Sequence, residues 1–178
     1  MEKRQYTISV FTEDRVGLLN RVTIIFTRRK INIDSLTASN SELDGVHRYT
    51  IVVEESEDRV QKVVAQLEKQ VEVLKAVYHS EENVVYQEIA LYKLPTDSLV
   101  LGGKAEGIVR SHNARILSVE KHFTVVEKTG HKEDTAALFE ALEPYGLLEF
   151  VRSGRVAITK PMKTLQTYIE EMQEQAKY

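Results

Sequence analysis

The sequence predicts an α+β protein built from two ferredoxin-like βαββαβ domains in tandem. Three observations lead to this prediction. Strand segments carry apolar residues at every second position, helical segments carry them three and four positions apart, and both halves of the 178-residue chain show the same order of elements. We expect domains over residues 1–80 and 81–160, followed by an amphipathic helix over 161–178. A chain of this length can bury a core as one domain or as two small ones.

The first strand is followed closely by the first helix. Residues 6–11 alternate along a strand with both faces mostly covered. The next apolar residues recur at helical spacing and form one face of a helix that starts near Gly17. They are Leu18, Leu19, Val22, Ile25 and Phe26. The basic run 28–30 marks the end of this helix, where cations interact favourably with the helix dipole.

Four further elements complete the first half. A second strand opens at Asn32 and Ile33, and the polar stretch after it ends in the turn signal Asp44–Gly45. The four elements are strands over 33–38, 47–54 and 71–78, and a helix that opens at Ser56 between the last two. This order places two helices on one face of a four-stranded antiparallel sheet.

The opposite face of that sheet needs a cover or must tolerate water. Residues that favour partial exposure there are Thr7, Ser9, Arg48 and Thr50, and residues that favour contact with a partner are Phe11, Leu36 and Val52. An edge strand beside such a face is a natural site for pairing with a second copy of the chain.

The second half repeats the order with weaker signals. Strands are expected over 85–94, 115–119, 122–126, 147–152 and 155–159, and a helix follows Gly130 and His131. The stretch 98–112 has apolar residues at helical spacing, but its three glycines weaken a helix. Its Gly-Gly-Lys sequence does not match a phosphate-binding loop, because the upstream glycine is missing and Ala105 replaces the hydroxyl residue that would hold magnesium.

Composition excludes several classes of function. The net charge is −3 and the one compact basic run is too short for a nucleic-acid track. The chain has no cysteine, so it forms no disulfide, thiol nucleophile or thiolate metal site. No apolar run has the length of a membrane span and the N-terminus has no apolar signal core, so we expect a cytoplasmic protein without membrane contact.

Nothing in the sequence points to catalysis or to a metal. The histidines lie on separate predicted elements, and no two have the spacing of a zinc-binding helix. They are His47, His79, His112, His122 and His131. A binding or regulatory role is therefore favoured over an enzyme.

The loop before the first helix has the features of a small-anion site. A helix N-terminus presents unpaired N–H groups and a partial positive charge, and Gly17 permits close approach to the backbone. The Asn32 side chain can both donate to and accept from a polar ligand. The alternative is structural: Asp14 caps the helix and Asn32 makes a turn.

Residues 5–78 resemble an ACT domain. The string TEDRVGLLNRVTIIFTRRKINIDSLT, residues 12–37, is similar to the opening of the small regulatory subunit of acetohydroxyacid (acetolactate) synthase. In that family a second domain of the same kind follows, which residues 80–160 match through element order and through RSGRVAIT, residues 152–159.

The resemblance implies a subunit without an active site or cofactor of its own. Such subunits bind and activate the acetolactate synthase catalytic subunit, which carries thiamine diphosphate, Mg and FAD. They also make it sensitive to feedback inhibition by a branched-chain amino acid, usually valine. A free-standing amino-acid sensor acting on a different partner is the alternative function.

The resemblance also implies where the effector binds. In the family the amino acid lies between two ACT domains of a homodimer, against the first loop of one chain and the start of the second strand of the other. The corresponding residues here are Asp14, Val16, Gly17, Leu18, Asn32 and Ile33. Many members have Asn where this chain has Asp14, and a carboxylate there can hold an ammonium but repels a ligand carboxylate.

Overall fold

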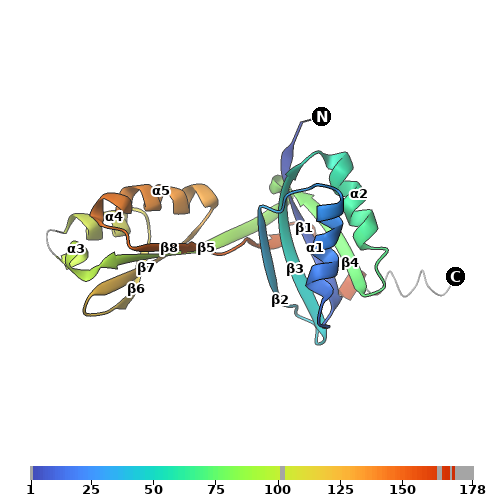
Figure 1. Cartoon of the computed structure of the whole chain (residues 1–178), viewed down its shortest axis with the longest axis horizontal. Coiled ribbons are helices and arrows are strands. Elements are labelled where there is room, and N and C mark those ends of the chain that lie inside the picture. The colour runs from blue at the N-terminus through green and yellow to red at the C-terminus, as the bar shows by residue number, and fades with distance from the viewer. Residues whose placement is uncertain (1, 101–102, 164–165, 169, 171–178) are drawn as a thin grey trace. The chain divides into compact units, whose positions relative to one another are not determined.

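The computed structural model describes residues 2–100, 103–163, 166–168 and 170. The chain divides into two compact units, Met1–Val85 with Arg155–Tyr178, and Tyr86–Gly154. Each unit contains a βαββαβ arrangement, as the sequence predicts (Figure 1).

The first unit follows the predicted order of elements. Its elements are β1 (Arg4–Glu13), α1 (Leu18–Arg28), β2 (Ser35–Asn40), β3 (Val46–Glu55), α2 (Glu57–Leu67) and β4 (Val73–Ser80). The strands form an antiparallel sheet in the order β2-β3-β1-β4, so β2 and β4 are its edges. The second strand begins two residues later than the predicted start at Ile33.

The core of this unit lies between the sheet and its two helices (Figure 1). Ile8 of β1 lies opposite Ile51 of β3, and both are fully buried beneath the helices. The helical stripe contributes Val22, Ile25 and Phe26, which the three- and four-residue spacing predicts.

The second face of the sheet differs from the sequence-based expectation. The side chains of Thr7, Ser9 and Thr50 are only 1%, 2% and 5% exposed, so the predicted partial exposure of these residues is wrong. Leu36, expected on this face, instead packs against the helix-side core, since it lies opposite Ile51. Arg48 is half-buried.

Part of the cover comes from the C-terminal segment. Arg155 Nη1 donates to Thr7 Oγ1 at 3.0 Å, and Arg48 Nη2 donates to the Ala157 carbonyl at 2.6 Å. Small hydroxyl side chains fit beneath a crossing segment and accept its hydrogen bonds, which allows a polar sheet face to be buried. Residues from Arg155 onward are thus grouped with the first unit.

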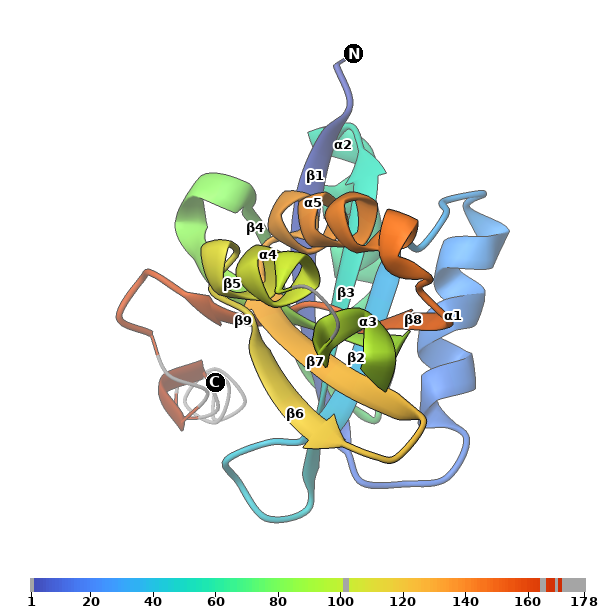
Figure 2. The same cartoon turned by 90° about the vertical axis from the view of Figure 1, so that its left-hand side faces the viewer.

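The second unit has the same topology. Its elements are β5 (Val84–Pro95), α3 (Thr96–Val100), α4 (Lys104–Ser111), β6 (Arg115–Val119), β7 (Phe123–Gly130), α5 (Lys132–Leu142) and β8 (Glu149–Arg152), with a 3-10 turn at Glu143–Tyr145. Another 3-10 turn, Glu81–Asn83, precedes β5 and lies in the first unit. The sheet order is β6-β7-β5-β8. The strand β9 (Val156–Thr159) lies in the segment that is grouped with the first unit. The helices lie on one face of this sheet (Figures 1 and 2).

Two sequence-based ambiguities have structural answers. The stretch 98–112 contains parts of two helices, and α4 begins after Gly103, which has a φ of 66° that favours glycine. Of the predicted terminal helix over 161–178, residues 161–163 are described and are not helical, residues 166–168 and 170 are helical, and the other positions lie outside the described residues.

Candidate functional site

The β1–α1 loop, residues 14–17, has the geometry of an open helix N-terminus. Gly17 is the N-cap of α1, with a φ of 89° and no atom within 4 Å of where a Cβ would lie. No side chain in the described part of the chain caps this helix, and its first turn contains no acidic residue. The partial positive charge of the helix end is therefore not offset by its own first turn.

Asp14 does not cap α1, so the alternative role of this residue as a helix cap is wrong. Its Oδ1 lies 3.3 Å from His47 Nε2 on β3, and its backbone N–H donates to the Gly45 carbonyl at 2.9 Å. Both groups also line a cavity of about 70 Å³ at the β2–β3 hairpin. The carboxylate is thus directed toward the hairpin. Sequence reasoning missed the contact with His47, since the two residues are 33 positions apart and belong to no common motif.

Two predicted contact residues on the loop differ in exposure. The side chain of Val16 is fully exposed, whereas that of Leu18 is only 4% exposed and belongs to the packed face of α1. In this chain, an aliphatic ligand could lie against the Val16 side chain, while Leu18 offers only its backbone. The Leu18 N–H already makes a long hydrogen bond of 3.5 Å to the Arg15 carbonyl.

Asn32 and Ile33 lie in the turn between α1 and β2. This turn begins at Lys30, which has a positive φ of 54°, and Asp34 N–H then donates to the Val52 carbonyl at 2.9 Å. The Asn32 side chain is exposed, while Ile33 is half-buried against the helix-side core. Asn32 is therefore a turn residue whose amide is also accessible to a ligand.

A single chain does not bring the two predicted groups together. The loop precedes α1 and Asn32 follows it, and the 11 residues of α1 span roughly 16 Å at a rise of about 1.5 Å per residue. One amino acid cannot contact both ends of such a helix. A site containing both groups would have to combine the loop of one copy with the turn of another.

The surface around the β2 edge is partly apolar. The strand β2 is an edge of its sheet and carries half-buried Leu36. On the adjoining helix, Leu19 and Ile24 are each 40% exposed. Such an edge with apolar side chains beside it suits strand pairing between copies.

The described residues show no metal centre. In ranges 2–100 and 103–163 together with 166–168 and 170, no group of three or more His, Asp or Glu side chains is placed to hold a metal ion. Within those same ranges, no helix has the length and apolarity needed to cross a membrane.

Models of two protein families match the two units. Residues 8–75 match the "AHAS small subunit-like ACT domain", and residues 87–161 match the "small subunit of acetolactate synthase". The first match ends within β4, and the second runs from β5 to just beyond β9.

Curated relatives match over nearly the whole chain. The acetolactate synthase small subunit of Mycolicibacterium smegmatis is 36% identical over 87% of this chain and 91% of that protein, and the Bacillus subtilis small subunit is 36% identical over 89% and 91%. A crystal structure of the acetolactate synthase small subunit from Thermotoga maritima, 28% identical, superposes with a TM-score of 0.79 over 88% of this chain and 97% of that one. From its fold, its first loop and these relatives, the chain belongs to the family of acetolactate synthase small subunits.

Proposed function

We propose that this chain is the non-catalytic regulatory subunit of an acetolactate synthase. It binds and activates a catalytic subunit that carries thiamine diphosphate, Mg and FAD, and it makes that enzyme sensitive to a branched-chain amino acid, with valine as the first candidate. The observation that supports this most is the match to acetolactate synthase small subunits over about nine-tenths of the chain. The proposal places the complex in the cytoplasm.

The effector site is proposed to form between two copies of the ACT unit. The length of α1 separates the β1–α1 loop from Asn32, so a shared ligand requires one group from each copy. Pairing of two β2 edges would extend the sheet from four strands to eight and cover Leu19 and Ile24 beside the edge. Ligand binding would then favour one dimer geometry, which is how the effector acts on the catalytic partner.

The chemistry of the loop suits an amino acid. A ligand carboxylate would lie at the uncapped N-terminus of α1 beside Gly17, and the aliphatic part would contact Val16. The ammonium would bind an oxygen of the Asn32 side chain from the other copy. The Asp14 carboxylate lies 3.3 Å from His47 Nε2, so it is directed toward the β2–β3 hairpin and away from this ligand position.

The test reconstitutes the catalytic subunit with this chain and measures acetolactate formation while valine is titrated. We expect the parent chain to raise activity and valine to lower it again. Asn32→Ala should keep the activation and raise the valine concentration needed for half-inhibition by about tenfold, because one charge-assisted hydrogen bond is lost.

A matched control is Asn83→Ala, an exposed asparagine in the 3-10 turn before β5. It should leave both activation and valine inhibition unchanged. Identical inhibition curves for Asn32→Ala and the parent would remove the pocket assignment. Failure of the parent chain to activate any acetolactate synthase catalytic subunit would remove the function itself and favour a sensor with another partner.

A further inference from the structure

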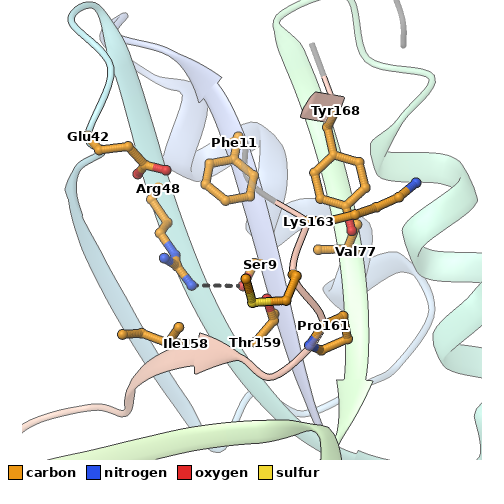
Figure 3. Close-up of a pocket in the computed structure, with 11 residues that line it drawn as sticks. Ser9, Phe11, Glu42, Arg48, Val77, Ile158, Thr159, Pro161, Lys163 and Tyr168 are labelled. Carbon is orange, nitrogen blue, oxygen red and sulfur yellow. Dashed lines mark hydrogen bonds between the residues drawn. The ribbon is translucent and has the colours of Figure 1, made fainter. Parts of the chain in front are cut away.

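A second cavity lies on the other face of the ACT sheet. Its volume is about 300 Å³, and its wall is formed by strands β1, β3 and β4 and by the C-terminal segment that crosses them (Figure 3). Its lining includes Ser9, Phe11, Glu42, Arg48, Val77, Met162 and Tyr168. None of them belongs to the β1–α1 loop or to the turn at Asn32.

Arg48 is a cation at this cavity that forms no direct ion pair with another described residue. One of its terminal nitrogens, Nη2, donates to Ser9 Oγ at 3.4 Å and to the Ala157 carbonyl at 2.6 Å. Its Nε is buried and has no hydrogen-bond partner among the described residues, and none of the ion pairs in that part of the chain includes Arg48. A guanidinium stays charged in proteins, and a half-buried charge is stabilised by an anion beside it.

The environment of Arg48 is unfavourable to its charge. Burial lowers the pKa of the guanidinium, and the carboxylate of Glu42, acting through space, offsets only part of this effect. The guanidinium carbon also lies 5.5 Å from the centre of the Phe11 ring, a contact that supplies some electron density but no negative charge. A bound carboxylate would compensate the charge that the protein leaves uncompensated.

The rest of the lining is mainly apolar. Phe11 and Tyr168 place their rings on one side of the cavity, and Val77 lies below them (Figure 3). A volume of about 300 Å³ is at the small end of ligand-binding pockets, which are mostly apolar with a few polar groups that fix orientation. The cavity therefore has room for a small ligand with a branched aliphatic or aromatic body.

We propose that this cavity binds a small carboxylate with an apolar body, held by Arg48 and enclosed by the C-terminal segment. The class includes aliphatic 2-amino acids and the same acids without the amino group. Glu42, which also lines the cavity, would favour the amino acid, because its carboxylate would attract an ammonium. Since the wall combines the sheet with residues from Ile158 to Lys163, an occupant would hold that segment against the sheet.

The test follows the methyl signal of Met162 in the full-length protein labelled with ¹³C at the methionine methyl groups. The chain has three methionines, so the spectrum is simple and Met162→Leu assigns the signal. Three probes of equal skeleton are titrated: L-leucine, 4-methylpentanoate and the neutral 4-methylpentanamide. We expect saturable shifts of Met162 with the two carboxylates and none with the amide.

Two variants locate the site. Arg48→Gln should weaken binding of both carboxylates at least about tenfold, because a charge-assisted hydrogen bond is lost. Val77→Phe should abolish the shift by filling the cavity. This variant keeps the hydrogen bonds of Arg48 to Ser9 and Ala157, so it tests the same site even if Arg48→Gln folds poorly. The matched control is Arg4→Gln, an exposed arginine on the same sheet, which should bind as the parent does.

The outcomes separate this proposal from the one for the loop. Asn32→Ala should leave the Met162 shifts unchanged whatever it does to valine inhibition. Tighter binding of L-leucine supports the amino acid as the ligand, and tighter binding of 4-methylpentanoate supports the acid without the amino group. The proposal is overturned if neither carboxylate moves the Met162 signal, if the amide moves it equally, or if Val77→Phe binds like the parent.

Discussion

The two units share one topology but differ in the second face of their sheets. In the first unit, seven consecutive residues of β1 are buried, Tyr6 to Thr12, so both faces of the strand are covered. In the second unit, β5 alternates between buried and exposed positions along its first half. Ile89 of β5 and Val151 of β8 are 47% and 54% exposed on the face opposite the helices.

This difference shows that the βαββαβ order determines only one face of each sheet. The helices cover one face in both units, and what happens on the other face depends on segments outside the repeat. In the first unit the C-terminal segment contributes Arg155, which is 3% exposed and donates to Gln5 and Thr7. The second unit has an exposed apolar face, a feature typical of surfaces that contact other proteins.

The largest expected effect tests whether the two cores are separate. Leu67 and Leu138 are each fully buried, one in each core. Replacing either by alanine should reduce the free energy of unfolding of its own unit by about 2–5 kcal/mol, from lost burial and the cavity left behind. Hydrogen exchange read by mass spectrometry should show Leu138→Ala losing protection within residues 86–154 while residues 4–80 keep it.

Leu67→Ala serves as the reciprocal variant and should give the opposite pattern. If either substitution removed protection from both units to the same degree, the chain would unfold as one cooperative body. The stabilities of the two sheets could then not be treated as independent.

A pair of identical substitutions tests the second faces directly. Val52 is 3% exposed beside Thr7 on the covered face, whereas Val151 is 54% exposed on the open face. Val52→Lys should reduce the free energy of unfolding by about 2–3 kcal/mol, because it buries a charge near Arg155. Val151→Lys should change it by no more than about 0.5 kcal/mol. Urea unfolding of both variants measures this difference, and equal losses would mean that the two faces are equally covered.

The helix-side half of the fold could be predicted because it follows short-range periodicity. The stripe of α1 and the alternation of β3 fall where spacing predicts them, and the strong string over residues 12–37 identified the family. The cover of the second face could not be predicted in this way. Arg155 bonds to Thr7 across 148 positions, and such polar pairings leave no periodic signal.

The candidate site divides along the same line. Gly17 lies at the helix start that the sequence predicts, since a glycine before an apolar stripe is a local signal. The pairing of Asp14 with His47 and the cavity beside Arg48 depend on strands brought together by the fold. One sequence feature does point to the cavity. In β1, Ser9 and Phe11 alternate with the core residues Ile8 and Val10, so they lie on the face that the helices do not cover.

The smallest expected effect concerns a buried tyrosine in the core of the second unit. Tyr92 is fully buried in β5, donates from its hydroxyl to the Thr135 carbonyl at 2.6 Å, and burial raises its pKa to about 12. In the unfolded chain the Tyr92 phenol ionises near its usual pKa of about 10. Burial of the neutral phenol therefore stabilises the folded state fully below pH 10, and this contribution is lost as the pH rises through about 12. Tyr92→Phe should therefore lower the free energy of unfolding by about 1 kcal/mol at neutral pH and reduce the decline above pH 10. The control is Tyr145→Phe, also in the second unit, which should show the same loss of unfolding free energy above pH 10 as the parent. If Tyr92→Phe also shows the parent's loss, another group titrates in this range.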